Sequence, residues 1–292
     1  MSRLSAAGAG SRRRRSRVRT VPLHAVVIGV TALWLLPTAG VFVSSLRPPQ
    51  DVTSSGWWTA FSPPFHFTLE NYGRVLGAYN MGRSFLNSLL ITIPATLIPL
   101  MVAAYAAYAF AWMRFRGREI LFTIVVASLV IPLQMTLIPI LRLFTAFGLV
   151  GTLPAVWLAH TGYGLPLTIY LLRNFMGALP RELLESASID GASPLTVFFR
   201  LIVPLSVPAI ASLAIFQFLW VWNDLLVALI YVGGRPDVAP MTVTVSNLVN
   251  SLGQNWQLLT SAAFVSMAVP LTVFFSLQRY LVRGILAGAV KG

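Results

Sequence analysis

The chain has 292 residues, of which 57% are hydrophobic and only 10% are charged, and its mean hydropathy is +0.77. This composition excludes an ordinary soluble globular protein and indicates an integral membrane protein. Cysteine is absent, which excludes disulfides and thiolate metal sites, while the formal net charge of +13 requires an explanation.

The first 21 residues contain much of that positive charge. They are rich in Ser, Ala, Gly and Arg, including the run Arg12 to Arg15, and we expect a disordered basic tail. Basic flanks of a membrane protein mark its cytoplasmic side, so the run does not indicate nucleic-acid binding. The apolar run at 23–46 is too long for the core of a signal peptide and predicts a retained span. A leader cleaved near Ala39 is the alternative.

Five more apolar stretches follow, and the expected fold is all-α, a polytopic membrane bundle of six transmembrane helices within residues 22–292. The five predicted spans are 85–110, 120–141, 153–172, 205–230 and 260–281, and the external loops are 47–84 and 233–258. The first loop is expected to carry a short surface helix near Leu69 to Leu76. In this arrangement 16 of the 21 Lys and Arg residues lie on the side of both termini, which the positive-inside rule places in the cytoplasm.

The cytoplasmic loop at 177–204 has the pattern of a helix-turn-helix. Pro180 suits the first turn of a helix, Gly191 can adopt the left-handed conformation that ends one, and Ser193 can cap the next. An apolar stripe then recurs with helical spacing at Leu195, Phe198, Phe199 and Ile202, and Pro204 is expected to end this second helix. The pattern alone leaves two readings equally open: a ridge that fits another protein's groove, or a loop that packs on its own bundle.

A resemblance favours the first reading. The spacing Glu185-Ser-Ala187, then Gly191, then Leu201-Ile-Val-Pro204 resembles the Glu-Ala-Ala loop of permease subunits of binding-protein-dependent ABC importers. Ser186 replaces an Ala of that pattern, and Leu201 and Val203 replace Ile and Leu, so each change keeps a small or apolar side chain. Further stretches are similar to carbohydrate-type permeases, in particular the second permease of the maltose system: Asn87-Ser88, Ile131 to Pro139, Trp220 to Asp224, and Gln278 to Gly292.

The resemblance implies a transport subunit that is not itself an enzyme. It implies a second homologous permease, a dimer of ATPase subunits that bind ATP and Mg²⁺, and an extracytoplasmic sugar-binding protein, all in or at the plasma membrane of a bacterium or archaeon. The cargo would be a mono- or disaccharide, with an α-glucoside as one candidate, moved by alternating access. The lone lysine, Lys291, cannot build a phosphate-binding loop, so this chain needs a separate ATPase. The contacts implied for the ATPase are Glu185, Ala187, Asp190, Gly191, Phe198, Phe199 and Pro204 in the loop, with Lys291 and Gly292 in the tail.

Candidate residues for a substrate pathway centre on Asp224, which is the only carboxylate inside a predicted span. A charge in hydrocarbon costs ~3 kcal/mol or more, so Asp224 is expected to face a partner or a water-filled path. The other candidates are Trp222, Asn223, Gln134 and Tyr163. Buried interhelical hydrogen bonds are the competing reading for each, as they are for His160 and Gln217. No second ligand stands at metal-binding spacing from His160. The loop 233–258 is expected either to reach the binding protein or to lie on the interface.

Two other functional classes are weighed against a permease. A polytopic transferase usually carries paired acids or His in its membrane-interface loops, but the acids expected outside are isolated: Asp51, Glu70 and Asp237. A secondary transporter would be indicated by an inverted repeat of broken spans, which the sequence does not display, and it has no use for a docking loop.

Overall fold

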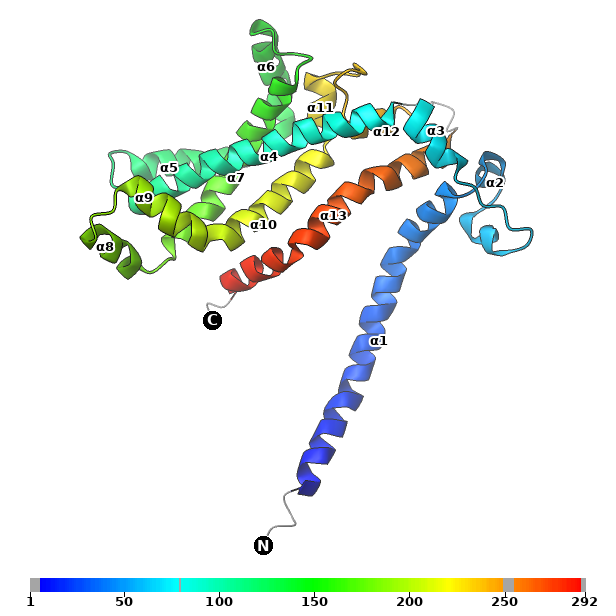
Figure 1. Ribbon diagram of the computed structural model, residues 1–292, viewed down its shortest axis with the longest axis horizontal. Helices are drawn as coiled ribbons and strands as arrows, with labels where there is room; N and C mark the ends of the chain where they lie inside the picture. Colours follow the sequence, from blue (N-terminus) through cyan, green and yellow to red (C-terminus); the bar gives the residue numbers. More distant parts are fainter. Residues whose placement is uncertain (1–5, 79, 249–254, 290–292) are drawn as a thin grey trace.

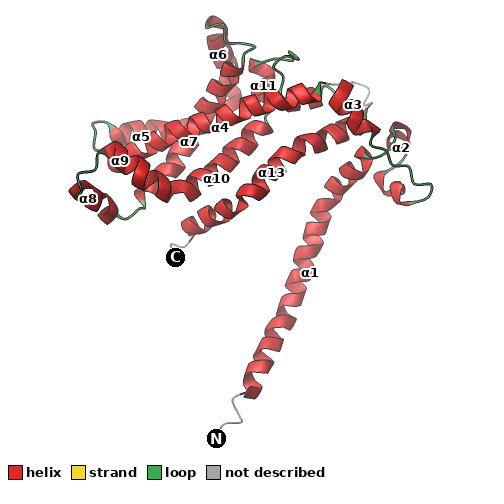
Figure 2. Cartoon of the chain, in the orientation of Figure 1, coloured by secondary structure: helices red, strands yellow, loops and turns green. Residues whose placement is uncertain are grey.

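The computed structural model describes residues 6–78, 80–248 and 255–289, and within these ranges every regular element is a helix, as expected (Figures 1 and 2). The α-helices are α1 (Ala6–Ser45), α2 (Pro49–Ser54), α3 (Glu70–Ala78), α4 (Met81–Trp112), α5 (Arg118–Ala127), α6 (Leu133–Ala146), α7 (Leu153–Gly177), α8 (Arg181–Ile189), α9 (Pro194–Val197), α10 (Val203–Trp222), α11 (Leu226–Tyr231), α12 (Met241–Ser246) and α13 (Trp256–Ala289). Shorter 3₁₀ segments are η1 (Trp57–Phe61) and η2 (Ser128–Val130), and η3 (Phe198–Ile202) is a π-helix.

The membrane-spanning helices match the expected spans with two differences. In the described residues, four helices are long and apolar enough to cross a bilayer: Pro22–Ser45, Met81–Trp112, Pro194–Trp222 and Trp256–Gln278. A fifth crossing is added if α5 and α6, which are bent by 106° relative to each other, count as one broken span. The remaining expected span, 153–172, corresponds to α7, which is 25 residues long but less apolar, because His160, Thr161 and Tyr163 lie in its middle. The polytopic helical architecture is therefore confirmed.

Helix α1 begins earlier than the first expected span. It starts at Ala6, so that it includes most of the stretch for which the sequence predicts disorder. Ala and Arg are good helix formers, and the basic stretch continues the apolar helix without a break. The apolar part of α1 extends away from the other helices, and only its C-terminal end meets α13 and η1 (Figure 1).

Two of the predicted spans are interrupted, and a local cause is visible in each. Span three breaks at Ile131, whose backbone is extended before Pro132, because proline disfavours helical geometry in the residue that precedes it. Span five does not continue to residue 230: α10 ends at Trp222, and a short bend at Asn223 and Asp224 leads into α11. Sequence hydropathy cannot detect either break, since the residues on both sides are apolar.

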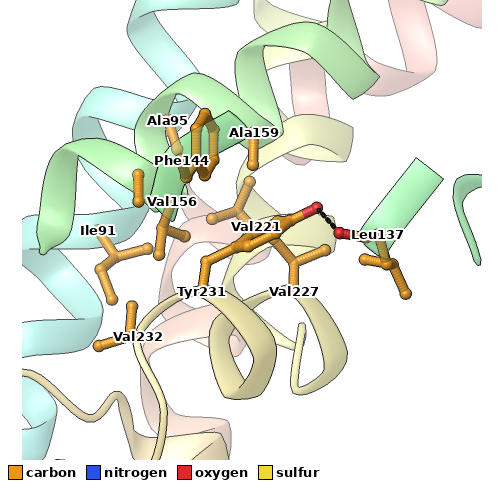
Figure 3. Packing of buried hydrophobic residues seen from close by; sticks show 11 residues of the cluster. Ile91, Ala95, Leu137, Phe144, Val156, Ala159, Val221, Val227, Tyr231 and Val232 are labelled. Atoms are coloured by element: carbon orange, nitrogen blue, oxygen red, sulfur yellow. Dashed lines mark hydrogen bonds between the residues drawn. The ribbon is translucent and has the colours of Figure 1, made fainter. Parts of the chain in front are cut away.

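The core of the bundle is built around α4, which packs along α7 and also contacts α10, while α10 packs on α13. One buried cluster joins α4, α6, α7, α10 and α11 around Tyr231, whose hydroxyl donates to the Leu137 carbonyl at 3.3 Å (Figure 3). A second cluster lies toward α8 and α9 and joins them to α4 and α7 through Phe198, Ile202 and Met176. The second cluster anchors the predicted cytoplasmic loop to the spans.

The loop at 47–84, which is expected to be external, contains short helical segments and a buried arginine. Helix α3 confirms the short helix expected near Leu69 to Leu76. Arg47 is buried, and its guanidinium donates to the Gly56 carbonyl at 3.0 Å and to the Ser55 hydroxyl at 2.7 Å. Asn71 donates to the carbonyls of Ser45 and Arg47, which fixes α3 against the end of α1.

Candidate functional site

The turn between α8 and α9 has the geometry that the sequence predicts. Gly191 follows α8 with a φ of +75°, a conformation that favours glycine because it has no Cβ. Ser193 caps α9 by accepting from the Thr196 N–H at 3.2 Å, and Pro194 begins that helix. The two short helices are thus held at a fixed angle by local chemistry, before any partner binds.

The apolar stripe on the second helix divides between two faces. Phe198 is only 2% exposed and stacks on Tyr105 at a centroid distance of 4.7 Å, and Ile202 is fully buried. Leu195 and Phe199 face outward with exposed fractions of 64% and 55%. Phe198 is expected from the sequence to be part of an exposed ridge that contacts an ATPase, but its burial does not agree with this. Phe198 instead anchors the loop to α4, and only Leu195 and Phe199 remain available to a partner.

Pro204 does not end the second helix, contrary to the sequence-based expectation. The helix continues through the π-helical segment η3 into α10, and the helical stretch from Pro194 to Trp222 is 29 residues long. The Val203 N–H bonds to the Phe198 carbonyl, five residues earlier, which is the wide π-helical turn. Pro204 follows this segment directly, as the second residue of α10, so the helix accommodates the proline next to its π-helical turn.

Two of the residues predicted to contact an ATPase, Glu185 and Asp190, lie on the exposed side of α8 and its turn. Glu185 is exposed and lines a groove of about 570 Å³ between α8 and the end of α4. Asp190 is exposed at the end of α8, next to Ile189, which is 87% exposed. Ala187 is half-buried and packs on the cluster around Phe198, so it shapes the loop from beneath.

Two anchors of this loop are not evident in the sequence. The Tyr108 hydroxyl donates to the Pro194 carbonyl at 3.2 Å, and the Trp112 indole N–H donates to the Met176 carbonyl at 3.0 Å. Tyr108 and Trp112 are four residues apart at the end of α4, on the side that meets α9 and α7. Aromatic residues with a polar atom near a predicted span end are the signal that could have identified them.

Asp224 occupies the bend between α10 and α11 and is engaged on three sides. Its carboxylate accepts from the backbone N–H groups of Val227 and Ala228, at 3.3 and 3.0 Å, and so caps α11. It also lies 3.7 Å from Nε2 of His160 on α7, and the Thr242 hydroxyl donates to its backbone carbonyl at 2.7 Å. The hydrogen bonds of the carboxylate are therefore local to α11, and its charge is matched across the helices by the neighbouring ring of His160.

The two residues before Asp224 in the chain, Trp222 and Asn223, do not share its contacts. Trp222 is buried, stacks on Phe218 and donates its indole N–H to the Ser266 carbonyl at 3.1 Å, so it belongs to the core between α10 and α13. Asn223 is exposed and donates to the Leu219 carbonyl of its own helix at 2.7 Å. The expectation that Trp222 lines a pathway does not agree with its burial.

Tyr163 and Gln134 are not brought together with Asp224. The Tyr163 hydroxyl bonds to those of Thr136, at 3.1 Å, and Tyr231, at 3.0 Å, which links α7 to α6 and α11. Gln134 is exposed on α6. The amide of Gln217 donates to the Ala95 carbonyl at 3.2 Å and joins α10 to α4, as expected of an interhelical bond.

Other expected features lie at the edge of the described residues or beyond it. Lys291 and Gly292 fall outside the described residues, as do 249–254 of the second external loop. In the described part of that loop, hydrogen bonding to Arg235 lowers the pKa of Asp237 below its usual range. The residues that are described contain no group of three His, Asp or Glu side chains close enough to hold a metal ion.

Comparisons with known proteins identify the family to which the chain belongs. Residues 100–287 match the family described as binding-protein-dependent transport system inner membrane component. The osmoprotective compounds uptake permease protein GgtD of Synechocystis sp. is 62% identical over 274 residues, which cover 93% of this chain and 92% of GgtD. The alpha-glucoside transport system permease protein AglG of Rhizobium meliloti is 56% identical, with 94% of this chain and 97% of AglG covered.

A solved structure has the same fold. The crystal structure of a bacterial ABC transporter involved in the import of the acidic polysaccharide alginate contains a chain that superimposes with a TM-score of 0.74. That match has 21% sequence identity and covers 91% of this chain and 97% of the other. With the family match and the relatives above, the conclusion is that this chain belongs to the family of inner membrane components of binding-protein-dependent transport systems.

Proposed function

We propose that this chain is the permease subunit of an ATP-driven importer that carries an α-glucoside across the inner membrane by alternating access. The observation that carries the proposal is the 56% identity to the alpha-glucoside permease AglG, across nearly the whole of both chains. At that identity the helices that surround a pathway share their packing.

The energy comes from a separate ATPase subunit, which binds ATP and Mg²⁺. This chain has one lysine in 292 residues, and that lysine lies next to the C-terminus, so it has no phosphate-binding loop of its own. The ATPase docks on the surface formed by Glu185, Ile189, Leu195 and Phe199, which combines one carboxylate with a ridge of exposed apolar side chains. The C-terminal residues Lys291 and Gly292, which are outside the described residues, are proposed to contact the same subunit.

The geometry of the second helix supports a direct mechanical link. Phe199 faces outward, while its neighbour Phe198 stacks on Tyr105, and both belong to the continuous helical stretch that ends at Trp222. A movement of the ATPase against Phe199 therefore displaces α10 and α4 together. The far end of α10 is the bend at Asp224, where the capped helix α11 can change its angle to α10.

A second, homologous permease completes the pathway, and an extracytoplasmic binding protein delivers the sugar. Exposed apolar side chains cover most of the apolar part of α1, which extends beyond the bundle (Figure 1). Such a surface is suited to a neighbouring membrane helix or to lipid. Both termini and the α8–α9 loop face the cytoplasm in this arrangement, because most Lys and Arg residues lie on that side.

The cargo is tested by uptake in cells that lack this gene and carry either the wild-type gene or an empty plasmid. Uptake of labelled maltose is measured with unlabelled trehalose, sucrose, cellobiose or glycine betaine as competitors. The α-glucosides trehalose and sucrose are expected to compete, whereas the β-glucoside cellobiose is not. The name of GgtD makes an osmoprotective compound the second candidate. Competition by glycine betaine alone would replace the α-glucoside with that second candidate.

A further inference from the structure

The groove beside α8 is basic, although it is lined by a predicted ATPase-contact residue. Its charged side chains are Arg114, Arg118, Arg181 and Glu185. A second hollow of about 580 Å³ adjoins it and shares the same three arginines. The two hollows therefore form one continuous basic surface between the α4–α5 connection and α8.

Two of these arginines have no acidic partner. Arg118 is bound by Glu119, with its Nη2 2.7 Å from Oε1, and it also donates to the Met113 carbonyl. Among the described residues, no carboxylate lies within ion-pairing distance of Arg114 or Arg181. Two guanidinium groups are thus free to bind an anion, and their planar forks match the oxygens of a phosphate.

The basic surface runs directly into an apolar one. Ile120 lines the second hollow and is 69% exposed, and it begins an exposed apolar face on α5 with Leu121 and Ile124. Helix α5 begins at Arg118 and is the first half of a broken span, so this face is at the depth where hydrocarbon begins. The ligand that fits both surfaces has an anionic head and a hydrocarbon tail.

We propose that this surface is a binding site for one anionic phospholipid, with its phosphate between Arg114 and Arg181 and an acyl chain along Ile120, Leu121 and Ile124. Anionic lipids gather where basic side chains flank the end of a span. The site borders α8, so an occupied site sets the position of the docking loop relative to the membrane. The inference uses the cytoplasmic orientation proposed above but does not depend on the cargo or on ATPase docking.

The test is lipid binding to the full chain, purified in detergent with the subunits that accompany it, and measured by native mass spectrometry. Phosphatidylglycerol is titrated into wild-type protein and into the double variant Arg114→Gln, Arg181→Gln. Removal of two basic groups from such a site is expected to weaken binding about 30-fold. Phosphatidylcholine of the same chain length is expected to bind no better to wild type than to the double variant.

Arg116 supplies a matched control, because it lies in the same connection and is exposed but lines neither hollow. Arg116→Gln is expected to keep wild-type affinity for phosphatidylglycerol, and all variants are expected to keep the wild-type melting temperature. An equal loss of phosphatidylglycerol affinity in Arg116→Gln would show that the lipid is attracted by general positive charge, and would contradict a specific site. Inorganic phosphate that displaces phosphatidylglycerol at equal concentration would overturn the lipid in favour of a soluble anion.

One further outcome would assign the groove to a protein. If the double variant binds phosphatidylglycerol like wild type but loses its ATPase subunit during purification, the arginines bind acidic side chains of that subunit and the lipid proposal fails. Loss of phosphatidylglycerol with the ATPase still bound supports the lipid site and leaves the proposed docking surface intact. The two proposals are therefore separated by the same preparation.

Discussion

At the residue scale, the structure separates side chains that hold the fold from those that remain available to a partner. Phe198 and Phe199 are adjacent in the sequence, yet one is buried against Tyr105 and the other is more than half exposed. Asp224 and Glu185 are both acids, but the Asp224 carboxylate accepts hydrogen bonds from backbone N–H groups of α11, whereas Glu185 is exposed. Residue type alone indicates neither distinction, since both depend on which neighbours the helices bring.

Glu185→Lys is expected to uncouple transport from ATP hydrolysis. Reversal of a charge that pairs across an interface costs about 2–5 kcal/mol, enough to release a partner subunit. The measurement is co-purification of the ATPase together with labelled sugar uptake. Glu182→Lys is the matched control, because Glu182 is exposed on the same helix but does not line the groove. Normal uptake in the Glu185 variant would contradict the docking role.

Asp224→Ala is expected to destabilise the protein by about 1–2 kcal/mol, because α11 loses its cap and His160 loses its acidic neighbour. Asp224→Asn keeps one amide oxygen for the cap and is expected to retain both melting temperature and uptake. Thermal unfolding in detergent and uptake in cells are the two measurements. A stable Asp224→Asn protein that fails to transport would restore substrate contact as the role of Asp224.

At the scale of elements, the turn and the π-helix connect the proposed docking surface to the spans. Gly191 sets the angle between α8 and α9, and η3 carries α9 into α10 without a break. The apolar stripe is wide enough to have two edges: Phe198 and Ile202 lie on the buried edge, and Leu195 and Phe199 on the exposed one. The periodicity therefore predicted a helix correctly but could not say which edge packs on the bundle.

Phe198→Ala and Phe199→Ala are expected to affect different properties, the first stability and the second association with the ATPase. Truncation of the buried Phe198 leaves a cavity beside Tyr105 and costs about 3–5 kcal/mol of stability. Truncation of the exposed Phe199 is expected to leave the melting temperature unchanged while it weakens association with the ATPase. Thermal unfolding and co-purification of both variants check this. A Phe198 variant with wild-type stability would show that the anchor is not required.

At the scale of the whole molecule, the bundle has the proposed docking loop at one end. Two of its membrane spans are broken. The broken spans at Pro132 and Asp224 both contact α7, through Tyr163 and His160 respectively. Irregular backbone within a membrane is tolerated only where protein or water satisfies it. The breaks are therefore expected to lie against protein or water in the assembled transporter.

The natural absence of cysteine makes the proposed orientation directly testable. Ser62→Cys in the first external loop is expected to react with a membrane-impermeant maleimide in intact cells. Ser186→Cys, exposed on α8, is expected to react only after the cells are opened. The positive-inside count is the physical basis for this assignment. The reverse labelling pattern would invert the topology and remove the docking loop from the cytoplasm.

The sequence by itself determined the membrane class, the position of most helices, the turn at Gly191 and the cap at Ser193. These features depend on composition, hydrophobic length and local backbone preferences, all of which act between residues close in the chain. Tertiary structure decided the burial of Phe198 and Trp222 and the surroundings of Asp224. These depend on contacts with distant residues, namely Tyr105, Ser266 and His160, which no local pattern encodes. The bend before Pro132 has a local cause in the proline, but hydropathy does not register it.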